Sequence, residues 1–419
     1  MRVLWFSVTP SLYEEKKYGG WVASLEKIIK ERCLDITLGI AFEYPEKCFK
    51  KIKDGVSYYP ISIMNVRKNK YMVKFGYKKE WMILRTACMK IVEDFKPDII
   101  QCFGSEWPFC AIASEVNIPV IVHMQGFTNV YNLSSELAMS VYDSRHVAGL
   151  NIFKHLSCVL QNKQRNIYDQ EERERMKINY YFMGRTEWDK NIVAHYSPKA
   201  QYFYCPEAIR PEIYNANIQW ELPPDKRLKL VTITQAGKLK GNEIILRTAE
   251  ILKKQFNIDF EWRVAGVKEL FLEFEKKTGI LAKNVNINLL GMIDSKEVVR
   301  ELASAHIYIH PAIIDNSPNS LCEAQIIGCP VIAANVGGIP QLVKDGETGL
   351  LFPYNEPHSL AFKIMDLYKD TKKMVSMSQK EIVLAKKRHD PIKLASTIQE
   401  IYLHCINDYV TRMEKNSAL

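Results

Sequence analysis

The hydrophobic pattern of the first two hundred residues alternates short apolar runs with amphipathic segments. The run at 3–8 predicts a strand, and the segment 21–30 predicts a helix because its apolar residues recur at the spacing of one helix face. Further buried strands are expected at 36–42, 98–103 and 119–124, with a helix between the last two. Such a succession of strands and helices predicts a parallel sheet covered by helices.

The pattern stops near residues 213–227, where prolines and short polar residues gather. A second strand–helix series then follows, with strands expected at 228–234, 260–265, 285–290, 307–310 and 331–334. We therefore predict a first Rossmann-like domain at 1–215, a linker at 216–228 and a second Rossmann-like domain at 229–390, followed by a terminal helical stretch at 391–419. Two such α/β domains would place a cleft between the carboxyl edges of their sheets.

The amino-acid composition indicates the class of protein and its cellular location. The 419 residues, 47% of them apolar and 25% charged, are typical of a soluble globular protein with more than one core. No run of about 18 apolar residues predicts a membrane span, and the N-terminal run is too short for a signal peptide. The ten cysteines include no Cys-x-x-Cys pair, so we expect reduced core residues and a cytoplasmic protein. The net charge of +9 fits an anionic donor, an anionic membrane surface or no specific partner.

One stretch carries distinctive chemistry. Asp315 and Glu323 bracket a polar turn that enters an apolar helix, and a Gly-Cys-Pro break at 328–330 and a Gly-Gly-Ile-Pro turn at 337–340 follow. The free N–H groups of a helix N-terminus favour phosphate, and carboxylates accept hydrogen bonds from sugar hydroxyls. A nucleotide sugar offers both groups. The structural alternative is a surface loop ahead of an ordinary core helix.

In this order, these elements resemble the donor-binding signature of family 4 glycosyltransferases of the group 1 type, which are retaining enzymes with the GT-B fold. The resemblance implies two Rossmann-like domains facing across a cleft, with the terminal helix crossing back to the first domain. It implies that Glu323 holds the ribose hydroxyls and that Asp315, an Asp where the family usually has Glu, holds the donor sugar. The helix N-terminus at Asn319, Ser320 and Leu321 would bind the diphosphate.

A glycine-rich turn at 237–241 follows the first strand of the second domain and suits a diphosphate. Lys240 and Gly241 match the second half of a family motif, whereas Gln235 stands where that family has an Arg. Lys238 is a second candidate cation, and an ordinary solvated helix N-terminus is the structural alternative. We assign Lys240 and Asp315 as catalytic.

The remaining donor-side assignments lie after other expected strands. Gly291 and Met292 follow the strand expected at 285–290. Gly19 and Gly20, between the first strand and the first helix, would let the backbone approach a ligand. A plain tight turn is the alternative.

Three clusters in the first domain follow strand ends and resemble a subset of family 4 enzymes found with surface-polysaccharide synthesis. They lie at 104–107, 123–126 and 184–189. Arg185 is assigned to the donor, and Glu106 and Gln125 to the acceptor side. Trp107 and Trp188 could equally be core residues.

The sequence thus predicts a retaining glycosyltransferase that moves a sugar from a nucleotide-diphosphate sugar, a UDP-sugar first of all, to a saccharide or lipid-linked acceptor in cell-surface polysaccharide synthesis. No Asp-x-Asp pair is present, so we expect no required metal or cofactor. The alternatives are a GT-B-fold nucleotide-sugar epimerase or hydrolase, and an inactive sugar-nucleotide-binding protein.

A basic segment with interleaved aromatic residues at 67–81 predicts contact with an anionic membrane surface, which would make the protein peripheral at the inner face of the membrane. A solvated helix face is the structural alternative. No nucleic-acid reader motif accompanies the basic segment, so no nucleic-acid partner is expected.

Overall fold

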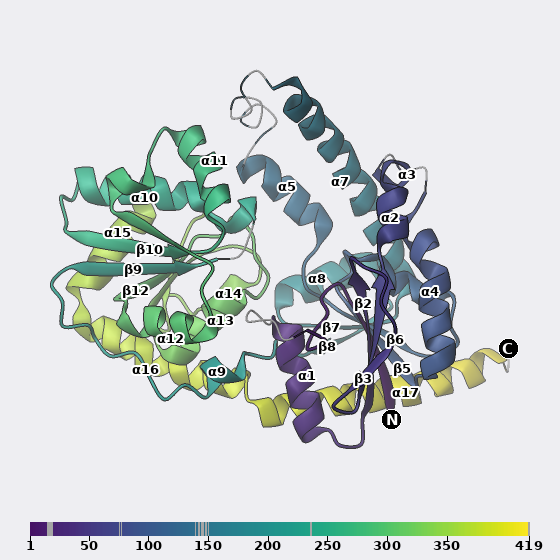
Figure 1. The fold of residues 1–419 in the computed structure, drawn as a ribbon. Helices are drawn as coiled ribbons and strands as arrows, with labels where there is room; N and C mark the ends of the chain where they lie inside the picture. Colours follow the sequence, from purple (N-terminus) through teal and green to yellow (C-terminus); the bar gives the residue numbers. More distant parts are fainter. Residues whose placement is uncertain are drawn as a thin grey trace. The chain divides into compact units, whose positions relative to one another are not determined.

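The computed structural model describes residues 1–14, 20–74, 76, 78–138, 140, 143, 146, 149, 151–234 and 237–417. The chain divides into two compact units, each with a largely parallel sheet and helices packed against it (Figure 1). The first unit consists of 1–129, 160–208 and 390–419, and the second of 130–159 and 209–389. The units thus change between Ala208 and Ile209, and the second unit includes a segment, 130–159, that the hydrophobic pattern did not single out.

The sheet of the first unit has the strand order β3-β4-β2-β1-β5-β6-β7-β8 within the described residues. These strands are β1 (Arg2–Ser7), β2 (Thr37–Tyr44), β3 (Lys51–Lys53), β4 (Val56–Ser62), β5 (Ile99–Phe103), β6 (Val120–His123), β7 (Tyr181–Gly184) and β8 (Gln201–Tyr204). Neighbouring strands pair in parallel, except that β3 pairs with β4 in the antiparallel sense. The predicted parallel sheet is therefore confirmed, with an antiparallel edge strand that the pattern did not show.

Helices along residues 1–208 and in the terminal stretch include α1 (Trp21–Arg32), α2 (Met64–Lys68), α3 (Lys70–Lys74), α4 (Glu80–Phe95), α5 (Thr128–Ala138), α7 (Ile152–Ile178), α8 (Glu187–Tyr196) and α17 (Pro391–Ser417). Most of α5 and the start of α7 belong to the second unit. The helix expected between β5 and β6 is present as the 3₁₀ helix η1 (Pro108–Ser114). Its seven residues leave room only for a short helical segment, and Pro108 at its first position has no N–H to donate.

The terminal helix α17 packs on the first unit, as expected. It contacts α1 and β5. Tyr402 of α17 accepts a hydrogen bond from the Trp5 indole at 3.0 Å, and Asp408 accepts one from the Tyr181 hydroxyl at 2.7 Å. Both bonds hold the helix against the first sheet.

The sheet of the second unit is parallel, with the order β11-β10-β9-β12-β13-β14 in the described chain. Its strands are β9 (Leu228–Ile233), β10 (Phe260–Ala265), β11 (Ile287–Gly291), β12 (Ile307–His310), β13 (Val331–Ala334) and β14 (Leu350–Phe352). Its helices include α9 (Pro211–Tyr214), η2 (Lys238–Lys240), α10 (Asn242–Lys254), α11 (Lys268–Thr278), η3 (Ala282–Val285), α12 (Ser295–Ser304), α13 (Asn319–Ile327), α14 (Ile339–Leu342), α15 (Pro357–Lys369) and α16 (Thr371–Arg388).

The strand predicted at 285–290 begins two residues late. Asn286 has a φ of +60°, which is a left-handed conformation that cannot belong to a strand, so β11 starts at Ile287 after η3. The strand consequently ends at Gly291.

Each unit has its own apolar core, built from one face or both faces of its sheet and the helices packed on it. The polar motifs of the sequence lie at the carboxyl ends of strands in both units. Within the described residues, no helix is both long and apolar enough to cross a membrane.

Candidate functional site

The second unit brings Lys240 and Asp315 together. The Lys240 Nζ atom lies 2.7 Å from Asp315 Oδ2, and the carboxylate is buried while the lysine side chain is 28% exposed. Burial alone would raise the pKa of Asp315, but the charge of Lys240 and the neighbouring His310 hold it well below its usual value. Asp315 is therefore an anion at neutral pH, with a partly accessible cation beside it.

Two glycines allow the backbone around this pair to close up. Gly241 has a φ of +77°, and a Cβ there would lie 1.9 Å from the carbonyl oxygen of Pro311. Gly337 has a φ of +54°, and its Cβ would lie 2.0 Å from the carbonyl oxygen of Asp315. Glycine is needed at both positions because any side chain would collide with backbone. The Lys-Gly and Gly-Gly elements thus fix the positions of the two charged residues.

A buried polar chain lies beneath the pair on β12. His310 Nε2 is 3.4 Å from Asp315 Oδ2, and His310 Nδ1 is 3.2 Å from the hydroxyl of Tyr308. The Tyr308 hydroxyl donates to Ser320 Oγ at 2.9 Å. Burial lowers the pKa of His310 more than Asp315 raises it, so the imidazole is neutral at pH 7. The chain links Asp315 to the start of α13.

The first turn of α13 holds the predicted phosphate-binding residues Asn319, Ser320 and Leu321. Pro318 is the N-cap, and no side chain of the described residues caps the helix there. The first N–H groups of a helix lack intrahelical partners and carry partial positive charge. This helix end therefore has the chemistry that an anionic group requires.

Glu323 lies in the same helix and is buried, but its partner was not foreseen. Arg210 Nε and Nη2 donate to Glu323 Oε1 and Oε2, each at 2.7 Å. This is a bidentate ion pair within the second unit.

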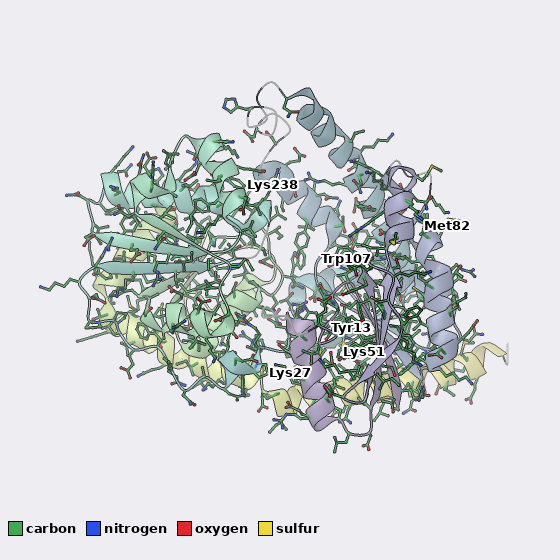
Figure 2. The ribbon with its side chains drawn as sticks, in the orientation of Figure 1. Tyr13, Lys27, Lys51, Met82, Trp107 and Lys238 are labelled. Carbon is green, nitrogen blue, oxygen red and sulfur yellow. The ribbon has the colours of Figure 1, made fainter. Side chains whose placement is uncertain are left out.

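The other donor-side candidates differ in surroundings. Lys238, labelled in Figure 2, lies with its Nζ 3.6 Å from Glu273 Oε2 rather than beside Asp315. Gly291 has a φ of +80° at the end of β11, and the neighbouring Met292 is 50% exposed. Gln235 and Gly19 lie outside the described residues.

The first-unit cluster is built from residues that directly follow β5, β6 and β7. Arg185 is buried, its guanidinium carbon lies 4.5 Å from the centre of the Trp21 ring, and its Nη2 donates to the carbonyl of Met124 at 3.3 Å. Gly20 precedes Trp21, and a Cβ there would meet no atom within 4 Å, so packing does not require glycine at that position. Gln125 is half-buried beside Met124.

Glu106 has unusual electrostatics in this cluster. Its backbone carbonyl accepts from Arg175 Nη2 at 3.2 Å, while its Oε2 is buried without a hydrogen-bond partner in the described chain. Burial and then the charge of Glu172 raise the pKa of Glu106 to about 7. Glu172 itself is held by Ser105 and by the backbone N–H of Thr128. Trp107, the next residue after Glu106, is 36% exposed rather than buried in the core (Figure 2).

We call Lys240, Asp315, the first turn of α13, Glu323 and their partners Arg210, Tyr308 and His310 the second-unit cluster. The three partner residues were missed by sequence reasoning. Tyr308 and His310 left a signal, because two polar-tipped side chains alternate on one face of a strand that leads into the polar turn. Arg210 left none, since an arginine before a proline is unremarkable.

Comparison with known proteins finds a family match over this part of the second unit. The family model described as "Glycosyl transferases group 1" matches residues 215–382, which contain Lys240, Asp315 and Glu323. The amylovoran biosynthesis glycosyltransferase AmsK of Erwinia amylovora is 26% identical over 188 residues, covering 43% of this chain and 45% of that protein. The chain thus spans about half the length of this curated relative.

Solved structures extend the likeness to the whole chain. Sucrose-phosphate synthase from Thermosynechococcus elongatus superimposes with a TM-score of 0.72 at 13% identity, covering 97% of this chain and 99% of that one. HepE from Anabaena, solved in complex with UDP and glucose, gives a TM-score of 0.63 at 14% identity, with 96% and 98% covered. At such identities the likeness concerns the fold. The chain therefore has the GT-B fold, and its residues 215–382 match the group 1 glycosyl transferases.

Proposed function

We propose that this protein is a retaining glycosyltransferase of family 4 that transfers a sugar from a UDP-sugar to a saccharide or lipid-linked acceptor during the synthesis of a cell-surface polysaccharide. The observation that carries the proposal is the second-unit cluster. A paired Lys240 and Asp315 stand directly before the N-terminus of α13, and the buried Glu323 lies within that helix. All of them fall inside the segment that matches the group 1 family model.

Each group has a role that follows from its chemistry. Lys240 and the first N–H groups of α13 stabilise the charge that develops on the leaving diphosphate. Asp315 is anionic and accepts hydrogen bonds from hydroxyls of the donor sugar, and Glu323 accepts those of the ribose. Transfer then proceeds on one face of the sugar, with the departing phosphate oxygen taking the acceptor's proton. No separate base, metal or cofactor takes part.

The first unit supplies the acceptor side of the proposal. Glu106 and Gln125 follow neighbouring strands and are suited to bind acceptor hydroxyls. Gly20 and Arg185 are assigned to the donor, and Arg185 lies over the ring of Trp21, the residue after Gly20. The similarity to the amylovoran biosynthesis glycosyltransferase AmsK supports a polysaccharide acceptor. HepE bound to UDP supports a uridine donor.

The test starts from a thermal-shift screen of nucleotide-diphosphate sugars and continues with the best donor. A glycosyltransferase releases the nucleoside diphosphate only when an acceptor is added, and NMR of the product shows whether the anomeric configuration is retained. Release without an acceptor indicates a hydrolase, and an altered donor sugar indicates an epimerase. Stabilisation without turnover of any acceptor indicates a sugar-nucleotide-binding protein.

We also propose that the basic segment 67–81 attaches the protein to an anionic membrane at the cytoplasmic face. Arg67 and Lys68 end α2, and Lys74 ends α3. The exposed Met72 lies within the segment, and the exposed Met82, labelled in Figure 2, directly follows it. Phe75 and Tyr77, two of its aromatic residues, lie outside the described residues. Each cation near acidic lipid contributes about 1 kcal/mol.

Vesicle sedimentation tests this attachment. Replacing Arg67, Lys68, Lys70 and Lys74 with Gln should reduce binding to acidic vesicles, and salt should weaken the binding of the unaltered protein. A matched control replaces four exposed lysines of α16 with Gln, namely Lys372, Lys373, Lys380 and Lys387. Equal losses in both variants would show a general charge effect, and no binding at low salt would remove the membrane from the proposal.

A further inference from the structure

Arg210 and Glu323 form the most completely satisfied ion pair in the second-unit cluster. The guanidinium meets the carboxylate through two parallel hydrogen bonds of 2.7 Å. The Glu323 side chain is 4% exposed and that of Arg210 is 19% exposed. The two residues are 113 positions apart in the sequence, so the fold, and not the local sequence, brings them together.

The backbone of Arg210 is itself fixed. Its carbonyl accepts hydrogen bonds from the N–H groups of Ile213 and Tyr214, at 2.9 and 3.0 Å, as the first turn of α9 forms. Ile213 is fully buried in the core of the second unit, and the Tyr214 hydroxyl donates to the carbonyl of Lys386 at 3.2 Å. The guanidinium therefore approaches Glu323 from an anchored position.

Glu323 is also the main charge that acts on this arginine. Burial alone would lower the pKa of Arg210, but Glu323, followed by Glu212 and Asp294, raises it above its usual value. The guanidinium is therefore charged. A buried carboxylate that loses such a partner is left with an uncompensated charge, which is strongly unfavourable.

The bidentate geometry leaves acceptor capacity free in a defined place. An ionised carboxylate has about four lone-pair sites, two on each oxygen. Arg210 takes one site on each oxygen. One site remains on each oxygen. Because the guanidinium takes the two sites that point the same way, the remaining sites point to opposite sides of the carboxylate, and each can accept a hydrogen bond from one hydroxyl.

We propose that Arg210 is a positioning residue that orients Glu323 so that one of its free sites accepts a hydrogen bond from the ribose 2′-hydroxyl, and that it thereby gives the protein its preference for ribonucleotides over 2′-deoxyribonucleotides. This inference rests on the proposed function. It assigns Arg210 no contact with the donor: its effect reaches the nucleotide only through the direction and charge of the Glu323 carboxylate.

The experiment compares ribose with deoxyribose in each variant. The nucleoside diphosphate that most stabilises the full-length protein, among UDP, GDP and ADP, and its 2′-deoxy analogue are titrated by calorimetry. The proteins are the unaltered chain, Arg210→Lys, Arg210→Met and Glu323→Gln. Arg247→Lys is the matched control, because Arg247 pairs with Glu243 on the exposed side of α10.

We expect the unaltered protein to prefer the ribonucleotide by about tenfold or more, as for one hydrogen bond to a charged group. Arg210→Met should reduce this preference to less than about threefold while the deoxynucleotide affinity changes little. Arg210→Lys keeps the positive charge but cannot form two parallel hydrogen bonds. The preference of this variant for the ribonucleotide should therefore be intermediate. Arg247→Lys should retain the full preference. A merely structural role would weaken both nucleotides equally.

The outcomes separate the inference from the proposed function. If Glu323→Gln abolishes the preference while both Arg210 variants retain it, the role of Arg210 is refuted and the donor site stands. If the unaltered protein binds no nucleoside diphosphate, or binds both sugars equally, the ribose contact of Glu323 is refuted and the inference falls with it. Should Arg210→Met fail to fold, the preference of Arg210→Lys decides, since an unchanged preference there overturns the inference.

Discussion

The two clusters treat buried carboxyl groups in opposite ways. In the second-unit cluster both acids face a cation: Asp315 faces Lys240, and Glu323 faces Arg210. In the first unit Glu106 faces another acid, Glu172, and one of its oxygens has no partner in the described chain. The pKa of Asp315 consequently lies well below its usual value, whereas that of Glu106 is raised to about 7.

This difference matches two kinds of chemistry. A carboxylate that stays ionised near neutral pH, as Asp315 does, can only accept hydrogen bonds, which suits the hydroxyls of a bound nucleotide sugar. A carboxyl that titrates near pH 7 can donate or accept, which suits an acceptor whose hydroxyl has to be bound and then released. The buried His123 of the first unit is no second titrating group there, because burial and then Arg185 keep its pKa well below the usual value.

The largest effect on activity is expected from removing Lys240, the cation that faces Asp315. Lys240→Ala should reduce turnover by about 10²-fold or more, as for the loss of one preorganised electrostatic contact. Lys238→Ala is the matched control and should have a mild effect, because Lys238 lies near Glu273 rather than Asp315. Steady-state kinetics with saturating donor measures both.

Equal large losses in the two lysine variants would show that both cations meet the diphosphate. Normal turnover in Lys240→Ala would contradict our account of the leaving group.

Much of this arrangement was accessible from the sequence because it is local. The strand ends, the polar turn at 315–323 and the close-packed glycines at 241 and 337 all follow from short-range patterns, and the structure places them at one end of one sheet. Hydrophobic patterns also predicted β1, β2, β5 and β6 of the first sheet, β9 to β13 of the second and the terminal helix, but not β3, β4, β8 or β14.

The charge pairings were not accessible, because they depend on residues far apart in the chain. Lys240 and Asp315 are 75 positions apart, and Arg210 and Glu323 are 113 apart. Hydrophobic periodicity does not show which cationic side chain the fold places beside which acid. It also did not show that segment 130–159 belongs with the second unit, where Lys277 donates to the carbonyl of Ala138 at 2.9 Å.

A smaller effect is expected from the second acid of the donor side. Glu323→Ala should weaken nucleotide binding by about 1.5–3 kcal/mol, the scale of a hydrogen bond to a charged group. Calorimetry with the nucleoside diphosphate measures it, and circular dichroism checks that the buried Arg210, left without its partner, has not unfolded the unit. Unchanged affinity in a folded variant would mean that Glu323 serves only to hold Arg210.

The smallest effect concerns the first unit, where Glu106 predicts a pH dependence near neutrality that Asp315 lacks, because the pKa of Asp315 is held well below its usual value. The folded-state pKa of Glu106 is about 7, above its ordinary value of 4.5, so the folded protein retains a proton that the unfolded chain loses first. The stability that this proton provides is fully present below about pH 4.5 and is lost as the pH rises through 7.

Glu106→Gln keeps the shape of the side chain and cannot titrate. Urea unfolding at several pH values should therefore show the unaltered protein losing about 1–2 kcal/mol relative to Glu106→Gln between pH 4.5 and 7.5, an amount below the full shift because the residue is only half-buried. Glu93→Gln, at an exposed position of α4, controls for the replacement itself. A constant difference between the unaltered protein and Glu106→Gln across this range would mean that Glu106 is ionised throughout, and the two clusters would then not differ in charge state.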